Sequence, residues 1–312
     1  MDPIWIILAF GMGWAVRQAR LPPLLGFLAA GFVLGAFGVK GGAVLAEAAD
    51  LGVWLLLFAI GLKLKLGQLK RPEVLVVATV HLGFMVVLGA GVLLGLGALG
   101  VPFLAELDSR TALLLAFALA FSSTVLAVKA LEERGEVGAL HGRVAIGILI
   151  IQDIAAVLFM AATKGTFPSP WALLLVAGLL LSRPLFYKLL DRAGHGELVM
   201  LLGLSLAVGA GAAGFQAVGL KADLGALFMG VLMSRHRRAN ELARSLFSIK
   251  DLFLLGFFLQ IGMSGTPTLA LAGIGVALAL LSPIKALLFF LLLTRLKLRA
   301  RTSLLASLSL AS

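Results

Sequence analysis

The sequence contains no cysteine and few charged residues. Of its 312 residues, none is Cys and 13% are Asp, Glu, Lys or Arg, whereas a soluble globular domain carries about 25% charged residues. The lack of cysteine excludes disulfide bonds and thiolate metal sites. The low charge, together with 61% hydrophobic residues and a mean hydropathy of +1.10, indicates a chain that lies mostly in lipid.

The motifs of soluble enzymes and of secreted precursors are missing as well. No Walker motif, GxSxG, HExxH or GxGxxG in a strand-turn-helix setting is present, so ATP hydrolysis and soluble-enzyme chemistry have no support. The first apolar stretch, residues 4–16, has no basic region before it and no small-residue cleavage motif after it. We therefore interpret it as a retained helix and not as a signal peptide.

Apolar runs divide the sequence into candidate membrane spans. At about 20 residues for each spanning helix, the length allows roughly ten to thirteen spans. The runs that we predict to be spans are 4–16, 24–37, 51–66, 74–99, 111–131, 144–162, 171–190, 198–218, 224–234, 246–263, 269–294 and a run that opens at 302. The last run reaches the chain end at Ser312, so we expect the natural chain to be longer.

Lysine and arginine alternate between the loops that connect these runs. Odd-numbered loops, counted with the span ends next to them, carry 21 of the 26 basic residues, even-numbered loops carry 4, and the remaining one, Lys285, is assigned to a span. By the positive-inside rule the odd loops are cytoplasmic, with Arg134 and Arg237 among their residues, while Lys40, Arg110 and Lys164 lie outside. The N-terminus is then outside, and the net charge of +11 needs no nucleic-acid partner to explain it.

One carboxylate lies near the middle of a predicted span. Asp153, in the run 144–162, has apolar residues on both sides. A charge at this depth costs about 2.5–3.5 kcal/mol on insertion scales, so it predicts an ion or proton pathway. The alternative is an aspartate that only pairs with a lysine or caps a helix. Gln152 adds an amide at the same depth, although its side chain is turned by about 100° around the helix, and it either lines the site or supports it from behind.

One basic residue also lies inside a span. Lys285 could neutralise Asp153 or carry a proton, and the alternative of snorkelling to the membrane surface needs a long reach, because about nine residues separate it from the end of its span. His81 has no partner at ligand spacing, so we interpret it as a packed, neutral histidine. Lys63 and Lys65 are interpreted as cytoplasmic anchors.

A run of hydroxyl side chains precedes Asp153 by one span. It comprises Ser122, Ser123 and Thr124, between Phe121 and Val125. Adjacent hydroxyls can satisfy backbone groups where a membrane helix unwinds, and such interrupted helices supply ligands for ions. They can equally bond back to carbonyls of an unbroken helix. The spacing alone does not decide between an interrupted helix and an unbroken one.

These residues resemble those of a known family. Residues 148–157 contain the pair Gln152-Asp153 and are preceded by Gly142 and Arg143. This segment resembles the Gln-Asp helix of Kef-type potassium:proton antiporters of cation:proton antiporter family 2. The matches cover nearly the whole chain. The other segments that are similar to this family are 21–26, 31–35, 57–62, 121–125, 224–232, 257–263 and Lys285.

The resemblance implies an all-α polytopic membrane protein with the inverted-repeat fold of sodium/proton antiporters. In that fold two broken helices cross, and the second would be incomplete here. A scaffold and dimer part would comprise about 1–70 and 197–265, and a core part about 72–163 and 268–312. The cation would be held at Asp153 with Ser123, Thr124 and Gln152 near it, while Lys285 compensates charge or carries a proton. An elevator-like movement of the core would expose the site alternately to each side.

The same resemblance implies a homodimer in the bacterial inner membrane that exchanges a monovalent cation for protons without a cofactor. Gln152 stands where electrogenic sodium antiporters have a second aspartate, which favours potassium and electroneutral exchange over sodium:proton antiport. The last span and a nucleotide-binding regulatory domain are expected beyond this chain. The rivals are a gated potassium channel or uniporter, for which no TVGYG-like filter is present, and an intramembrane enzyme, for which a second intramembrane carboxylate is missing.

Overall fold

The computed structural model describes residues 3–19, 21–64, 67, 70–101, 104–164, 169–265 and 281–311 of the chain, and every regular element among them is helical. The chain divides into two compact units. Unit 1 comprises Met1–Lys65 and Met160–Ile274, and unit 2 comprises Leu66–Phe159 and Gly275–Ser312. The expected all-α class is confirmed. The scaffold role and the core role remain predictions.

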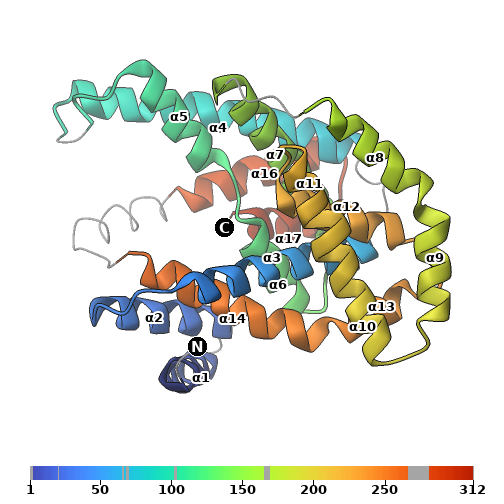
Figure 1. Cartoon of the computed structure of the whole chain (residues 1–312). Helices are drawn as coiled ribbons and strands as arrows, with labels where there is room; N and C mark the ends of the chain where they lie inside the picture. Colours follow the sequence, from blue (N-terminus) through green and yellow to red (C-terminus); the bar gives the residue numbers. More distant parts are fainter. Residues whose placement is uncertain are drawn as a thin grey trace. The chain divides into compact units, whose positions relative to one another are not determined.

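Unit 1 contains the first three helices and most of the second half of the chain (Figure 1). Its helices are α1 (Pro3–Gln18), α2 (Pro23–Ala36), α3 (Ala43–Lys63), α8 (Trp171–Leu181), α9 (Arg183–Arg192), α10 (Glu197–Leu204), the π-helix η2 (Ser205–Ala213), α11 (Gly214–Ala217), α12 (Ala222–Met233), α13 (Ala239–Ser245) and α14 (Phe247–Met263). Helix α3 packs against both α12 and α14, so it forms the middle of the unit. Its residues Leu55 and Phe58 are fully buried in the apolar core.

Glycine allows two of these helices to approach closely. Gly61 of α3 faces Gly230 of α12, and a Cβ on Gly230 would lie 2.9 Å from the Gly61 Cα and closer still to the Phe58 carbonyl oxygen. In lipid, where apolar side chains gain little by leaving their surroundings, such close backbone packing is a main source of helix association. These two positions therefore tie α12 to α3.

Unit 2 contains the helices that carry the predicted site residues. They are α4 (Pro72–Ala98), α5 (Ser109–Ala120), α6 (Thr124–Glu133), the part of α7 (Leu140–Lys164) up to Phe159, α16 (Ser282–Arg295) and α17 (Ala300–Leu310). Helix α4 packs against α5 and α16, while α17 packs against α16 and α6. Segments from the middle and from the end of the sequence thus form one body.

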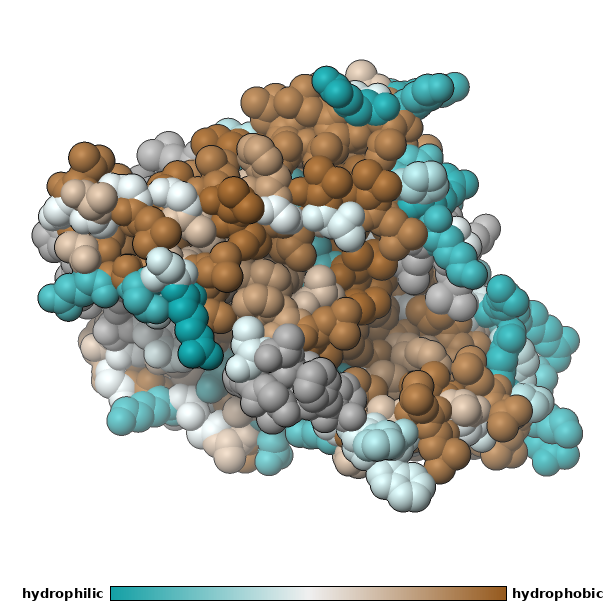
Figure 2. All heavy atoms as spheres, turned by 90° about the horizontal axis from the view of Figure 1, so that it is seen from above, coloured by the Kyte–Doolittle hydropathy of each residue, from teal (hydrophilic) through white to brown (hydrophobic). Residues whose placement is uncertain are grey.

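Five helices among the described residues are long and apolar enough to cross a membrane, or up to seven when each bent helix pair counts as one span. Figure 2 shows a face of the molecule on which apolar side chains predominate. Exposed apolar residues such as Phe10, Trp14 and Leu173 are what a lipid-facing surface requires. Each of the predicted runs contains a helix within its described residues.

Two predicted spans differ from the structure in where a helix begins or bends, and a third can be compared only in part. Helix α3 begins at Ala43, not at residue 51, because a helix can continue past Glu47 and Asp50 beyond the apolar run. The run 171–190 bends by 46° between α8 and α9, where Pro184 follows at the start of α9 and cannot donate a helical hydrogen bond. The run 269–294 lies partly outside the described residues, and only its α16 portion can be compared.

Candidate functional site

The fifth predicted span is an interrupted helix. Helix α5 ends at Ala120, the backbone is extended at Phe121 (ψ 153) and Ser123 (ψ 111), and α6 begins at Thr124. The Ser123 hydroxyl caps the new helix by accepting a hydrogen bond from the Leu126 backbone N–H at 3.4 Å, which suits a serine at this position. Of the two structures that the hydroxyl run left open, the broken helix is the one observed.

Asp153 meets the beginning of α6. The Thr124 hydroxyl donates a hydrogen bond to Asp153 Oδ2 over 3.1 Å, and the carboxylate on α7 is half-buried. Thr124 is the first residue of its helix, where unpaired backbone N–H groups and the helix dipole favour negative charge. The break therefore offers an anion-stabilising end to a carboxylate that lies in an apolar helix.

Lys285 meets the other side of the break. Its Nζ donates a hydrogen bond to the Phe121 carbonyl oxygen over 2.7 Å, and the residue is 7% exposed. Phe121 caps the C-terminal end of α5, where the helix dipole favours positive charge. The half-buried carboxylate and the buried ammonium thus use the two opposite helix ends that one break creates. Direct pairing of Lys285 with Asp153 remains a prediction.

Aromatic rings and a third helix hold the extended segment. The Phe117 ring stacks on Phe159 of α7 at 3.6 Å and meets Phe121 edge-on at 4.8 Å. The Ser122 hydroxyl donates a hydrogen bond to the carbonyl of Leu310, the last residue of α17. The end of α17 therefore lies at the same break. The sequence hinted at Ser122 through its place in the hydroxyl run, but a backbone carbonyl such as that of Leu310 gives no sequence signal.

Gln152, the residue before Asp153 in α7, is buried, with 1% of its surface exposed. Within the part of the chain that the structure describes, neither its amide oxygen nor its amide nitrogen has a hydrogen-bond partner. Buried amides normally form hydrogen bonds, so this amide can still bind an ion or a water molecule. The described residues contain no group of three or more His, Cys, Asp or Glu that could hold a metal ion. The available ligands are hydroxyl, amide, carboxylate and carbonyl oxygens, which suit hard cations.

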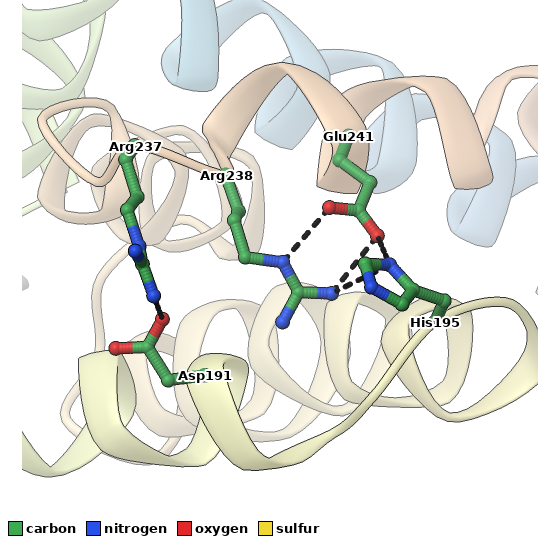
Figure 3. A pocket seen from close by; sticks show the side chains of 5 residues that line it. All are labelled: Asp191, His195, Arg237, Arg238 and Glu241. Carbon is green, nitrogen blue, oxygen red and sulfur yellow. Dashed lines mark hydrogen bonds and ion pairs between the residues drawn. The ribbon is translucent and has the colours of Figure 1, made fainter.

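A second polar cluster lies in unit 1 and lines an open pocket of about 410 Å³ (Figure 3). Arg237 pairs with Asp191 at 3.0 Å, and Arg238 pairs with Glu241 at 2.8 Å, while His195 Nδ1 lies 2.7 Å from the Glu241 carboxylate. Hydrogen bonds from Arg238 and then from His195 lower the pKa of Glu241 to about 2. Arg237 likewise holds the pKa of Asp191 below its ordinary value. Each carboxylate in this cluster already has a cationic partner.

Arg238 also connects two chain segments. Its guanidinium donates hydrogen bonds to the carbonyl oxygens of Leu190, over 2.5 Å, and Gly194. The cluster thus fastens the turn between α9 and α10 to the start of α13. Its geometry is that of a structural clamp, because the charges satisfy one another and leave the pocket without a net unpaired charge.

Comparison with known proteins places the chain in a family. It matches the family described as sodium/hydrogen exchanger, transmembrane, over residues 6–312. It is 28% identical over 310 residues to YbaL of Escherichia coli (strain K12), which is named as a cation/proton antiporter, with 91% of this chain and 54% of that protein covered. It is 32% identical over 272 residues to the glutathione-regulated potassium-efflux system protein KefC of Cronobacter sakazakii, with 80% and 42% covered.

A plant protein is similar as well. The K(+) efflux antiporter 2, chloroplastic, of Arabidopsis thaliana is 28% identical over 310 residues, covering 87% of this chain and 25% of that protein. The chain spans about half the length, or less, of these curated relatives. The match over nearly all of its residues, together with its apolar helices, shows that the chain is a multi-pass membrane protein that belongs to the sodium/hydrogen exchanger transmembrane family.

Proposed function

We propose that this chain is the membrane part of a potassium:proton antiporter in which Asp153 binds the proton and the cation in turn. The observation that supports it best is that the two ends of the broken helix contact a half-buried carboxylate and a buried ammonium. Thr124, at the start of α6, bonds Asp153, while Lys285 bonds the Phe121 carbonyl at the end of α5. Interrupted helices with charged side chains at mid-membrane are the usual ion sites of secondary transporters.

The exchange follows from the chemistry of a carboxylate in an apolar helix. An uncompensated charge there is unfavourable, so Asp153 binds either a proton or a cation. The Thr124 hydroxyl and the Gln152 amide supply further oxygens to a cation from which water has been stripped. Since one carboxylate takes one proton or one monovalent cation, the cycle exchanges them one for one and moves no net charge.

Two facts favour potassium. The relatives include proteins named as potassium-efflux systems and K(+) efflux antiporters. Gln152 is neutral, so the site has one carboxylate and binds one positive charge at a time. A second carboxylate at this position would increase the positive charge bound in each cycle. We include in this proposal a bacterial inner-membrane location, an N-terminus on the outside and a homodimer. Alternating access is ascribed to unit 2, because the broken helix, Asp153 and Lys285 all lie in it, and the scaffold role is ascribed to unit 1.

Purified protein in liposomes tests the proposal. A gradient of potassium, sodium or lithium is imposed, internal pH is followed with a trapped dye, and a permeant-anion gradient sets the membrane potential. We expect proton movement to be fastest with potassium and to be the same at each potential. Potassium flux without proton movement would identify a channel or uniporter, and a dependence on potential would overturn one-for-one exchange.

A further inference from the structure

A buried histidine lies beside the proposed site without using its polar atoms. His81 of α4 is 0% exposed, and its ring stacks on Phe289 of α16 with centroids 3.5 Å apart and planes 7° from parallel. Among the residues that the structure describes, neither ring nitrogen has a hydrogen-bond partner. A buried donor and acceptor without hydrogen-bond partners destabilise a fold. On packing alone, a phenylalanine at this position would therefore stabilise the fold more than a histidine does.

The side chain that could use this histidine is Lys285. It lies four residues before Phe289 on α16, so the two share a helix face, and its charge acts on the His81 ring. Other charged side chains on the helices packed against α4 are Arg110 of α5 and Arg295 of α16, and the charge of neither acts on the His81 ring. Lys285 therefore stands out as the charged partner of this ring.

Lysine is suited to a change of partner. Its ammonium carries three donors on a flexible four-carbon stem, and in this structure it donates to the Phe121 carbonyl at the break. If the break rearranges during transport, that hydrogen bond is lost, and a buried ammonium without an acceptor is strongly unfavourable. A neutral imidazole has one acceptor nitrogen, and the His81 ring stacks on Phe289, which lies one turn further along α16 than Lys285.

We propose that His81 is a second hydrogen-bond acceptor for the Lys285 ammonium. The ammonium donates to His81 in the state of the transport cycle in which it no longer donates to the Phe121 carbonyl. His81 is then a positioning residue, because it acts through Lys285 and not on the transported ion. This inference rests on the proposed function, since it assumes that the break rearranges. It explains why an otherwise apolar contact with Phe289 contains two polar atoms.

Two substitutions separate this role from simple packing. His81→Phe keeps the stacked ring and removes both nitrogens, whereas His81→Gln keeps an acceptor. We expect the melting temperature of His81→Phe to equal or exceed that of wild type, while its exchange falls at least about tenfold, the effect of losing one hydrogen bond to a charged group. His81→Gln should recover most of the activity. His141→Gln is the control, because His141 is a buried histidine of unit 2 that pairs with Glu136 at 3.2 Å.

A stable His81→Phe protein that exchanges like wild type would overturn the proposal, as would a His81→Gln protein as inactive as His81→Phe. The second measurement does not depend on transport. The chain has four histidines, so imidazole signals from ¹⁵N-histidine-labelled protein can be assigned with His81→Gln. We expect saturating potassium to move the His81 signals in wild type and not in Lys285→Met.

The two measurements distinguish the two proposals. If wild type shows no exchange in liposomes but its His81 signals respond to potassium through Lys285, the antiport function fails and the link between His81 and Lys285 stands. If the His81 signals of an actively exchanging wild type do not respond, or respond equally in Lys285→Met, the role of His81 as an acceptor fails and the antiport function stands.

Discussion

The two polar regions of this protein satisfy their charges in different ways. In the cluster of unit 1, Arg237 bonds Asp191 and Arg238 bonds Glu241, so guanidinium meets carboxylate, and the Arg237 side chain is 79% exposed. At the broken helix of unit 2, the ammonium of Lys285 is buried and donates to a neutral backbone carbonyl. Both regions are rich in polar atoms, but unit 2 relies on helix ends and hydroxyls where unit 1 uses ion pairs.

The difference supports the proposed position of the ion site in unit 2. Exposed ion pairs contribute little stability and change little when a small cation arrives. Buried polar atoms without a hydrogen-bond partner among the described residues, such as those of the Gln152 amide, can instead bind an ion and release it. Local departures from complete satisfaction mark functional sites in otherwise well-bonded proteins. We therefore propose that the open pocket in unit 1 is structural and that the break in unit 2 is the functional site.

Neutralising one carboxylate in each region is the strongest test of this comparison. Asp153→Asn should reduce potassium-driven proton flux by at least about 100-fold, because an amide cannot exchange a proton for a cation. Its shape is nearly that of aspartate, so the protein should still insert and fold. Asp191→Asn, in the charged cluster, should exchange within about twofold of wild type, as an exposed pair contributes little.

Both variants are measured in liposomes at matched protein content, with size-exclusion profiles to confirm folding. Wild-type exchange by Asp153→Asn would return Asp153 to the role of a structural aspartate. A large loss in Asp191→Asn would show that the cluster of unit 1 takes part in transport.

Much of the site could be predicted because its charges interrupt apolar runs. Asp153 and Lys285 are visible in the sequence for this reason, and the structure places both at the break. The break itself could not be decided, since Ser122, Ser123 and Thr124 favour an interrupted helix and a hydroxyl-bonded helix equally. The ammonium contact with the Phe121 carbonyl could not be found at all, because backbone atoms carry no sequence signal.

Part of the fold was predictable for a similar reason. Hydropathy locates apolar runs, but it does not say where a helix continues into polar sequence, so it does not predict the first eight residues of α3. The lack of a partner at ligand spacing predicts a packed His81, and the structure buries it against Phe289. Its position next to Lys285 depends on how α4 meets α16, which are about 200 residues apart in the sequence, and no local pattern encodes such a contact.

Glycine packing offers a test in which stability, not transport, distinguishes the regions. Gly230→Ala in unit 1 would place its Cβ 2.9 Å from the Gly61 Cα, so the backbones of α3 and α12 must separate. We expect a loss of about 1–3 kcal/mol, typical of overpacking, and a lower melting temperature. Gly91→Ala, on α4 of unit 2, has no described atom within 4 Å of the added Cβ and should gain roughly 0.5–1 kcal/mol from reduced backbone entropy. Equal melting temperatures for the two variants would contradict the close approach of α3 and α12.

The smallest expected effect concerns the clamp of unit 1. Hydrogen bonds from Arg238 and His195 lower the pKa of Glu241 from 4.5 to about 2, so the clamp stabilises the fold above the unfolded-state pKa and loses that contribution as pH falls toward 2.

Arg238→Gln removes the guanidinium that bonds Glu241 and the Gly194 carbonyl. We expect exchange in liposomes to stay near wild type from about pH 6 to 9, where Glu241 is ionised in both proteins. Hydrogen exchange at residues 193–196, corrected for its intrinsic pH dependence, should be faster in the variant at neutral pH. The difference from wild type should narrow as pH falls toward 2, because protonating Glu241 weakens its bonds to Arg238. Equal protection of this turn at neutral pH would show that the cluster does not fasten it, and a matching loss of ion exchange would show that a region with fully paired charges can still control transport.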